Sequence, residues 1–326
     1  MTDPASRPVA LITMANGYVG PALARTLASR GFDLVLQGAP QTGNMAGIEM
    51  SLGDLVPQLE SIGASVHTVT DIDLTTADGN HALVASALDR FGRIDSACLV
   101  TGVIVVGRFL DMTVEQWERI KRTNLDMVFH GLQAVLPPMS AAGSGQVVVF
   151  TSATGGRPEP MTSIYGGTRA GANGLVRAVG LEHARDGIQV NAVGTNFMDF
   201  PGFLQASGAD RDPERRARIE GQVPMRRLGT MDELASFTAA LLDGSNRFQT
   251  GQFFDFSGGW GCLAVGQRNE RVVAALHEQI DHYLHTDFTA VPYAPFIDLA
   301  EALCKRTAID SELRAAFFNS GAECVE

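Results

Sequence analysis

Short apolar segments of strand length alternate along most of the chain with amphipathic segments of helix length. This alternation restricts the fold more than any other feature of the sequence. The apolar segments are unbroken runs rich in Val, Ile and Leu. Such runs are typical of strands buried on both faces, and strand–helix repetition is typical of a parallel sheet covered by helices. We therefore expect a three-layer α/β fold with a parallel sheet of about seven strands.

The alternation also sets the expected domain boundary. Strands are expected at 8–13, 34–36, 65–69, 97–100, 146–151, 188–193 and 252–256. Helices are expected at 18–30, 52–62, 77–91, 113–136, 162–185, 231–243 and 269–285, and the fourth is expected to stop at Pro137-Pro138. The alternation of strand-length and helix-length segments ends at Trp260. We place a catalytic domain at 1–262 and a C-terminal extension of unknown role at 263–326.

Composition and charge exclude several classes of partner. The net charge is −11 and the isoelectric point is about 5.1, so nucleic acid is a poor candidate. We find no apolar run long enough to span a membrane and no signal sequence in the first residues. The four cysteines lack metal-ligand spacing and are typical of reduced thiols in the cytoplasm: Cys98, Cys262, Cys304 and Cys324. We therefore expect a cytoplasmic protein without a metal.

The turn after the first strand is where such folds bind a dinucleotide. Glycines there allow a tight turn and a close approach of the pyrophosphate to the following helix. The turn runs from Thr13 to Gly20, with Met14 and Tyr18 at two positions where that pattern has glycine. The second strand ends Gln37-Gly38, without an acid for a ribose hydroxyl. Two interpretations stay open: an irregular turn that still binds a cofactor, or a closed cofactor site.

Ser152, Tyr165 and Arg169 are the candidate catalytic residues. Ser152 ends the fifth expected strand, and the other two lie four residues apart on one helix face. A guanidinium beside a phenol favours the phenolate, which could remove a proton from a substrate. The chain has 25 Lys and Arg residues, of which only Lys121 and Lys305 are lysines. A general preference for arginine is therefore an alternative explanation of Arg169.

The two patterns together resemble the halohydrin dehalogenases, a cofactor-independent branch of the short-chain dehydrogenase/reductase superfamily. That superfamily has a Rossmann-like fold, and its dehydrogenases carry Ser, Tyr and Lys at the spacing seen here. The resemblance covers residues 8–260 and implies a halide site at Tyr18, Asn196, Phe197 and Met198. Thr154, Phe200 and Phe203 are candidate residues of the substrate pocket. Asn124 matches an asparagine that dehydrogenases use in proton relay, and we expect it to be structural here.

Residues 283–326 resemble an early fragment of class III pyridoxal-phosphate aminotransferases. The lysine that forms the Schiff base in that family has no counterpart here, so we expect no pyridoxal phosphate. A fusion remnant or an added interaction segment is the preferred interpretation. We expect His282, His285 and Asp287 to be polar residues rather than metal ligands.

The resemblance implies conversion of vicinal haloalcohols to epoxides with release of halide, and ring opening by small anions in reverse. The chain would then be a carbon–halide lyase that needs no cofactor. The alternatives are an NAD(P)-dependent short-chain oxidoreductase with Arg in place of Lys, or a catalytically silent scaffold. Small molecules are the expected partners, and relatives suggest a homotetramer.

Overall fold

Seven strands form one sheet in the computed structural model, in the order β3-β2-β1-β4-β5-β6-β7. All neighbouring strands run parallel. The structure describes residues 7–38, 50–259, 274–275, 277–279, 294–306, 313–315 and 317. The strands are β1 (Val9–Ile12), β2 (Asp33–Gln37), β3 (Val66–Val69), β4 (Ser96–Leu99), β5 (Gly145–Ser152), β6 (Ile188–Thr195) and β7 (Phe253–Phe256). The expected three-layer Rossmann-like α/β fold is confirmed.

Helices connect the strands and begin where the sequence offers capping side chains. Thr113 and Thr230, for example, each form a reciprocal capping box with the residue three positions later. The helices are α1 (Gly20–Ser29), α2 (Leu52–Ser61), α3 (Ala77–Phe91), α4 (Val114–Lys121), α5 (Met127–Ala142), α6 (Ser163–Glu182), α7 (Pro201–Ser207), α8 (Pro213–Gln222), α9 (Met231–Leu242) and α11 (Ala294–Arg306). Short helical turns are η1 (Phe109–Asp111), η2 (Arg122–Asp126), η3 (Ala153–Gly155) and η4 (Ala184–Asp186).

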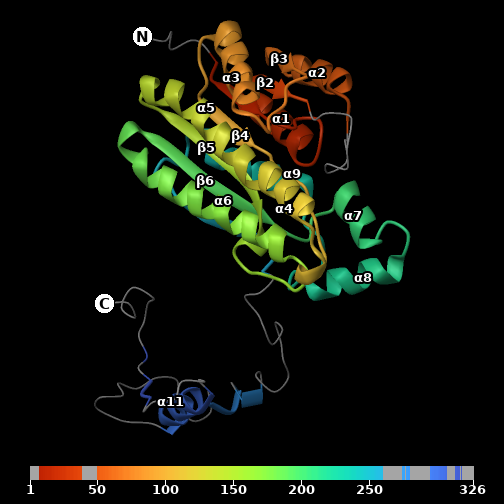
Figure 1. The fold of residues 1–326 in the computed structure, drawn as a ribbon, viewed down its shortest axis with the longest axis vertical. Coiled ribbons are helices and arrows are strands. Elements are labelled where there is room, and N and C mark those ends of the chain that lie inside the picture. Colours follow the sequence, from red (N-terminus) through yellow and green to blue (C-terminus); the bar gives the residue numbers. More distant parts are fainter. Residues whose placement is uncertain are drawn as a thin grey trace. The chain divides into compact units, whose positions relative to one another are not determined.

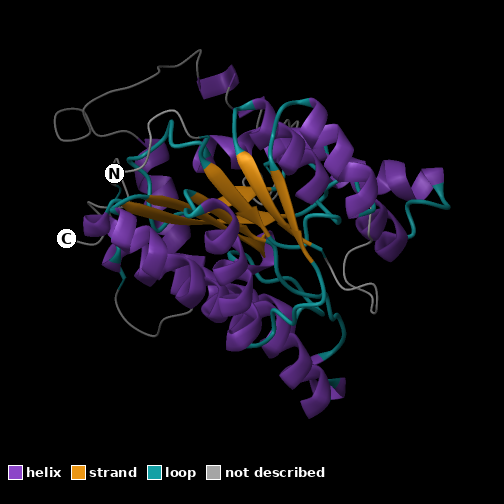
Figure 2. Ribbon diagram, turned by 90° about the horizontal axis from the view of Figure 1, so that it is seen from above, coloured by secondary structure: helices purple, strands orange, loops and turns teal. Residues whose placement is uncertain are grey.

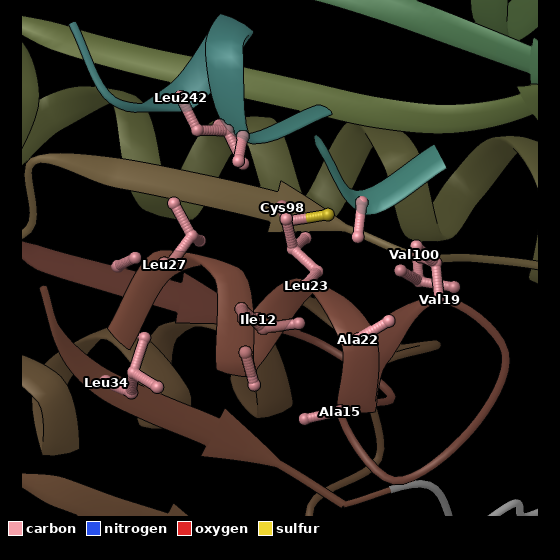
Figure 3. Close-up of a cluster of buried hydrophobic side chains, with 14 of the residues drawn as sticks. Ile12, Ala15, Val19, Ala22, Leu23, Leu27, Leu34, Cys98, Val100 and Leu242 are labelled. Carbon is pink, nitrogen blue, oxygen red and sulfur yellow. The ribbon is translucent and has the colours of Figure 1, made fainter. Parts of the chain in front are cut away.

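Helices cover both faces of the sheet (Figures 1 and 2), and an apolar layer lies between the sheet and the helices on each face. On one face, alternate strand residues such as Ile12 and Leu34 pack against Leu23 and Leu27 of α1 and Leu242 of α9 (Figure 3). On the other face the strands pack against α3, α5 and α6. Burial of a leucine side chain contributes about 1.5–3 kcal/mol, so these layers are the main source of stability.

The strand order places the candidate site. The chain reverses its direction of winding between β1 and β4, since β1 neighbours both β2 and β4. In open parallel sheets, ligands bind outside the carboxyl ends of the strands at this reversal. Ser152 and Thr195 are the last residues of β5 and β6 and lie opposite each other in the ladder. The carboxyl edge of the sheet is therefore the place to look for chemistry.

Two expectations about individual elements are wrong. α5 does not stop at Pro137-Pro138 but continues through both prolines to Ala142, where Met139 is fully buried in the core. The burial of this last turn offsets the hydrogen bonds that the prolines cannot make. The segment expected to be irregular after β6 contains α7 and α8, and α11 was not expected. Of the helix expected at 269–285, only 274–275 and 277–279 are described, and both pieces are helical.

The chain divides into two compact units, Met1–Ala264 and Val265–Glu326. The second unit contains α11, where Phe296 packs edge-on against Phe317 with ring centroids 4.7 Å apart. Cys262, Cys324, His282, His285 and Asp287 lie outside the described residues. In the parts of the chain that the structure describes, no helix is long and apolar enough to cross a membrane.

Two glycines of α6 give a matched test of this packing. A Cβ at Gly180 would lie 2.7 Å from the Gly251 nitrogen, whereas a Cβ at Gly174 would meet nothing within 4 Å. We expect Gly174→Ala to raise the free energy of unfolding by up to about 1 kcal/mol, because alanine favours a helix. Gly180→Ala should lower it, because the helix must move away from the β6–β7 connection. Urea unfolding of both variants measures the difference, and equal effects would contradict this packing.

Candidate active site

Ser152 and Thr154 form a small hydroxyl cluster at the carboxyl end of β5. Ser152 Oγ lies 2.8 Å from Thr154 Oγ1 and accepts a bond of 3.3 Å from the Thr154 backbone N–H. Both side chains are buried. When Thr154 supplies both bonds, the Ser152 hydroxyl proton stays available for a ligand oxygen.

Tyr165 and Arg169 lie one turn apart in the first half of α6, and both are buried. The guanidinium carbon of Arg169 is 5.5 Å from the centroid of the Tyr165 ring. Arg169 donates to Thr101 Oγ1 at 3.1 Å, to the Thr101 carbonyl at 2.6 Å and to the Phe150 carbonyl at 3.3 Å. Its Nε is buried without a partner in the described structure. Arg169 thus ties α6 to the ends of β4 and β5 and does not hydrogen-bond the phenol.

Asn124 lies beside Arg169, and both side chains approach Gly102 in the segment after β4. It lies in η2, a π-helical turn between α4 and α5, and it is fully buried. Its side chain accepts from the Val103 N–H at 2.8 Å and donates to the Val103 carbonyl at 3.0 Å. Gly102 has φ +99°, and a Cβ there would lie 2.3 Å from Arg169 Nη2 and 2.4 Å from Asn124 Oδ1. Only glycine fits where these side chains converge on the segment after β4.

The turn after β1 keeps a glycine-like backbone without the glycines. Met14 has φ +49° and Tyr18 has φ +52°, in the left-handed region that glycine favours. Gly20 is retained at the start of α1, where a Cβ would lie 2.6 Å from the Ala15 carbonyl oxygen. No side chain caps the N-terminus of α1, and its first turn has no acidic residue. Met14 and Tyr18 therefore hold backbone conformations that glycine adopts without strain.

The Tyr18 side chain packs against residues of β5 and β6 near the carboxyl ends of these strands. Its hydroxyl lies 2.6 Å from Thr195 Oγ1. Its ring packs edge-on against Phe150 and Phe200, with centroid distances of 5.7 and 4.9 Å. Burial raises the pKa of the Tyr18 phenol well above its ordinary value. Tyr18 is therefore a neutral hydrogen-bonding group at the carboxyl ends of the strands, the edge where parallel sheets bind their ligands.

The residues after β6 form a rigid turn. Phe197 has φ +57°, and its ring packs edge-on against Phe203 with centroids 6.2 Å apart. Met198 bridges Gly229 in strand fashion. Asn196 donates to Glu159 Oε1 at 3.3 Å, and burial raises the pKa of that carboxyl. The structure thus brings Tyr18 and Phe200 together and groups Asn196, Phe197 and Met198 in a neighbouring wall.

Three residues at this edge were not predicted: Thr101, Thr195 and Glu159. Each is reached through a side-chain contact with a predicted residue. Thr195 ends a strand, which is a signal that the sequence could have supplied. No group of three or more His, Cys, Asp or Glu residues placed to hold a metal occurs in the described part of the chain.

Comparison with known proteins covers most of the first unit. The family model described as Enoyl-(Acyl carrier protein) reductase matches residues 15–261. The chain is 31% identical to D-beta-hydroxybutyrate dehydrogenase of Rhizobium meliloti over 77% of this chain and 97% of that protein. It is 27% identical to a 3-oxoacyl-(acyl-carrier-protein) reductase of Staphylococcus aureus over 77% and 96% of the two chains.

Solved structures give the same result. Levodione reductase matches with a TM-score of 0.69 and 27% identity, over 77% of this chain and 96% of that chain. Acetoin dehydrogenase from Enterobacter cloacae matches with a TM-score of 0.68 and 28% identity, over 78% and 96%. A second family model, Aminotransferase class-III, matches residues 247–326, which include the tail that resembles such enzymes.

The expectation of a haloalcohol dehalogenase is therefore wrong. The relatives are named as dehydrogenases and reductases, which makes an oxidoreductase the supported class rather than a carbon–halide lyase that forms epoxides. The halide site at Tyr18, Asn196, Phe197 and Met198 rested on the same resemblance and loses its basis. The error arose because the residues at two glycine positions, Met14 and Tyr18, were interpreted as a closed cofactor site, although both adopt the left-handed backbone that glycine favours. By sequence and by fold, the chain belongs to the short-chain dehydrogenase/reductase superfamily.

Proposed function

We propose that the protein is an oxidoreductase that interconverts a hydroxyl and a carbonyl group on a small molecule, with a nicotinamide dinucleotide as cofactor. The observation that carries the proposal is the position of the two hydroxyl residues: Ser152 ends β5, and Tyr165 lies one turn before Arg169, which bonds the Phe150 carbonyl of the same strand. In the described structure no group hydrogen-bonds to the Tyr165 hydroxyl, which is therefore available to a substrate. The relatives named above are dehydrogenases or reductases and support the same class.

The main chain fits a dinucleotide, and one side chain lies in its way. The left-handed turn and the uncapped N-terminus of α1 suit a pyrophosphate, because helix N–H groups and the helix dipole attract anions. The unpartnered Nε of Arg169 is a donor for a sugar hydroxyl. Gln37 ends β2, where dinucleotide-binding folds place an acid for the adenosine ribose, and its side chain instead turns inward and accepts from the Met14 N–H. The Tyr18 ring must rotate away from Thr195 before the nicotinamide half can enter.

The chain's own residues handle the proton and the substrate oxygen. When bound, the cofactor supplies or accepts the hydride. Ser152 donates a hydrogen bond to the substrate oxygen, since its own acceptor position is filled by Thr154. Tyr165 donates its phenolic proton to the oxygen during reduction and takes a proton from the hydroxyl during oxidation.

Arg169 supports this proton transfer through its charge. The guanidinium is buried and forms no ion pair with a carboxylate in the described structure. A buried positive charge without an acidic partner favours a negative charge that develops nearby, which here forms on the Tyr165 oxygen. In the proton transfer itself Arg169 acts only through its charge, because its hydrogen bonds go to Thr101 and Phe150 and none goes to the phenol.

We also propose that the protein is a homo-oligomer. Large apolar side chains are exposed on the outer surface of α4 and α5, with Val114 71%, Trp117 40% and Phe129 47% exposed. Association of copies through this surface would remove the apolar side chains from water. Sedimentation of the purified chain should therefore give a mass above that of a monomer, and a monomer at micromolar concentration would contradict it.

Substitution of the two hydroxyl residues tests the proposed chemistry. Tyr165→Phe should lower kcat for ketone reduction by roughly 10²–10⁴-fold, the usual contribution of a general acid. Ser152→Ala should lower it by roughly 10²–10³-fold, because a donor to the developing charge is lost. Loss of absorbance by NADH or NADPH measures the rate, with Ser140→Ala as the control at the opposite end of the sheet. Full activity in Tyr165→Phe would refute the assignment.

The position of the Tyr18 ring predicts how cofactor affinity should change. Tyr18→Gly should tighten binding of NADH or NADPH by about 10- to 1,000-fold. Displacing the ring costs roughly 1.5–4 kcal/mol, the sum of one hydrogen bond and two aromatic contacts. Met14→Gly is the matched control, because it relieves the same left-handed backbone without removing the ring. Fluorescence titration measures both affinities. Equal gains would show that backbone strain, and not the ring, limits binding.

A further inference from the structure

A second feature of the carboxyl edge is a cavity of about 900 Å³ beside the turn after β6. Its walls come from that turn, from the segment between α8 and α9, from α9 and from the end of β7. Its volume lies within the range of sites for drug-sized molecules. None of the catalytic residues proposed above lines it, so the chemistry described so far does not account for it.

The walls of the cavity are mostly apolar. Met198, Val223, Met225, Phe237 and Phe256 all line it. The rings of Phe237 and Phe256 are 5.5 Å apart and belong to the apolar layer under α9. The bridge from Met198 to Gly229 fixes one wall, so the cavity is preformed.

The charges at the rim select against an anionic ligand. Arg227 is held by Glu233 through two bonds, and this pairing lowers the Glu233 pKa to about 2. Asp255 pairs with Arg157. Asp232 also lines the cavity, and no ion pair to it is found in the described structure. The charge of Arg227 is neutralised by Glu233, whereas the carboxylate of Asp232 has no cationic partner in the described structure. The rim therefore repels carboxylates and phosphates and suits an uncharged molecule.

The cavity lies within reach of the catalytic hydroxyl. Ser152, Thr195 and Phe256 are opposite one another on β5, β6 and β7. Neighbouring strands are about 4.8 Å apart, so the Phe256 backbone is about 10 Å from that of Ser152, and in-register side chains share one face. Asn196 lines the cavity and also bonds Glu159, in the loop that leads to α6 and Tyr165. An extended chain of roughly seven carbon–carbon bonds advances ~1.3 Å per bond and so reaches across ~9 Å of this gap.

We propose that this cavity holds the uncharged apolar body of the substrate, whose reacting oxygen lies at Ser152 and Tyr165. The substrate class is then an apolar alcohol or ketone with roughly seven or more carbons beyond the reacting centre, and not a carboxylate or a phosphate ester. The proposal rests on the proposed oxidoreductase function and adds a substrate class to it.

The neutral fluorescent probe N-phenyl-1-naphthylamine tests the cavity without any turnover. Ala240 lines the cavity from α9, and Ala240→Trp should weaken probe binding at least tenfold. The matched control is Ala142→Trp, the same substitution at an exposed alanine of α5. Met225→Asp is a second variant, because Met225 lines the cavity yet is 65% exposed and tolerates a charge. Undecan-2-one should displace the probe and decanoate should not. Unchanged binding in both cavity variants, or displacement by decanoate, would overturn the proposal.

Kinetics with methyl ketones of increasing length separate this proposal from the proposed function. In Ala240→Trp, kcat/KM for undecan-2-one should fall at least tenfold through KM, whereas that for butanone should stay unchanged. Reduction of both ketones with no change in this preference would overturn the substrate class and leave the oxidoreductase function standing. Probe binding as expected with no reduction of any ketone would overturn the function, and with it the link between cavity and catalysis.

Discussion

The parallel ladder between β5, β6 and β7 is the constraint on which the rest of the site depends. Because the strands run parallel and in register, their last residues form one row along one edge. That row places the Ser152 hydroxyl, the Thr195 hydroxyl that holds Tyr18, and the Phe256 wall of the cavity about one strand spacing apart. A shift of one residue in the register of any of these strands would turn the side chain of its last residue to the opposite face of the sheet.

Elements with strong local signals could be predicted from the sequence. The helix at 77–91 has a threonine before it, a left-handed glycine after it and an amphipathic pattern between, and its bounds agree with α3. The unbroken apolar runs gave all seven strands because parallel strands are buried on both sides. What failed was the treatment of proline as a stop signal at Pro137-Pro138, where burial of Met139 outweighs the local preference. The π-helical turn that holds Asn124 has no local signal, because it depends on contact with the segment after β4.

At the site, spacing identified which residues meet but not what they do. Ser152, Tyr165 and Arg169 are brought to one edge as the pattern indicates, and the sequence also indicates that Tyr18 replaces a glycine. The direction in which Arg169 donates its hydrogen bonds could not be inferred, since its acceptors are a side chain and main-chain carbonyls of β5 and of the segment after β4. The identities of Met14 and Tyr18 likewise did not reveal the left-handed backbone of the turn after β1. That gap allowed a dehalogenase to be inferred from a turn whose Met14 and Tyr18 still adopt the left-handed backbone that glycine favours.

Several bulky residues near the carboxyl edge of the sheet have strained backbone conformations, which contacts from the rest of the fold must stabilise. Met14, Tyr18, Met161 and Phe197 all adopt positive φ values, and each bulky residue in that region costs on the order of 1–3 kcal/mol. Each strained residue is held by a specific contact. Gln37 binds the Met14 N–H, Thr195 binds Tyr18, Gly107 binds the Met161 carbonyl and Gly229 binds the Phe197 carbonyl. These contacts come from strands and loops far apart in the sequence, so the strain persists only while the sheet is assembled. Rotation of the Tyr18 side chain would release only its contact with Thr195 and leave the other three contacts in place.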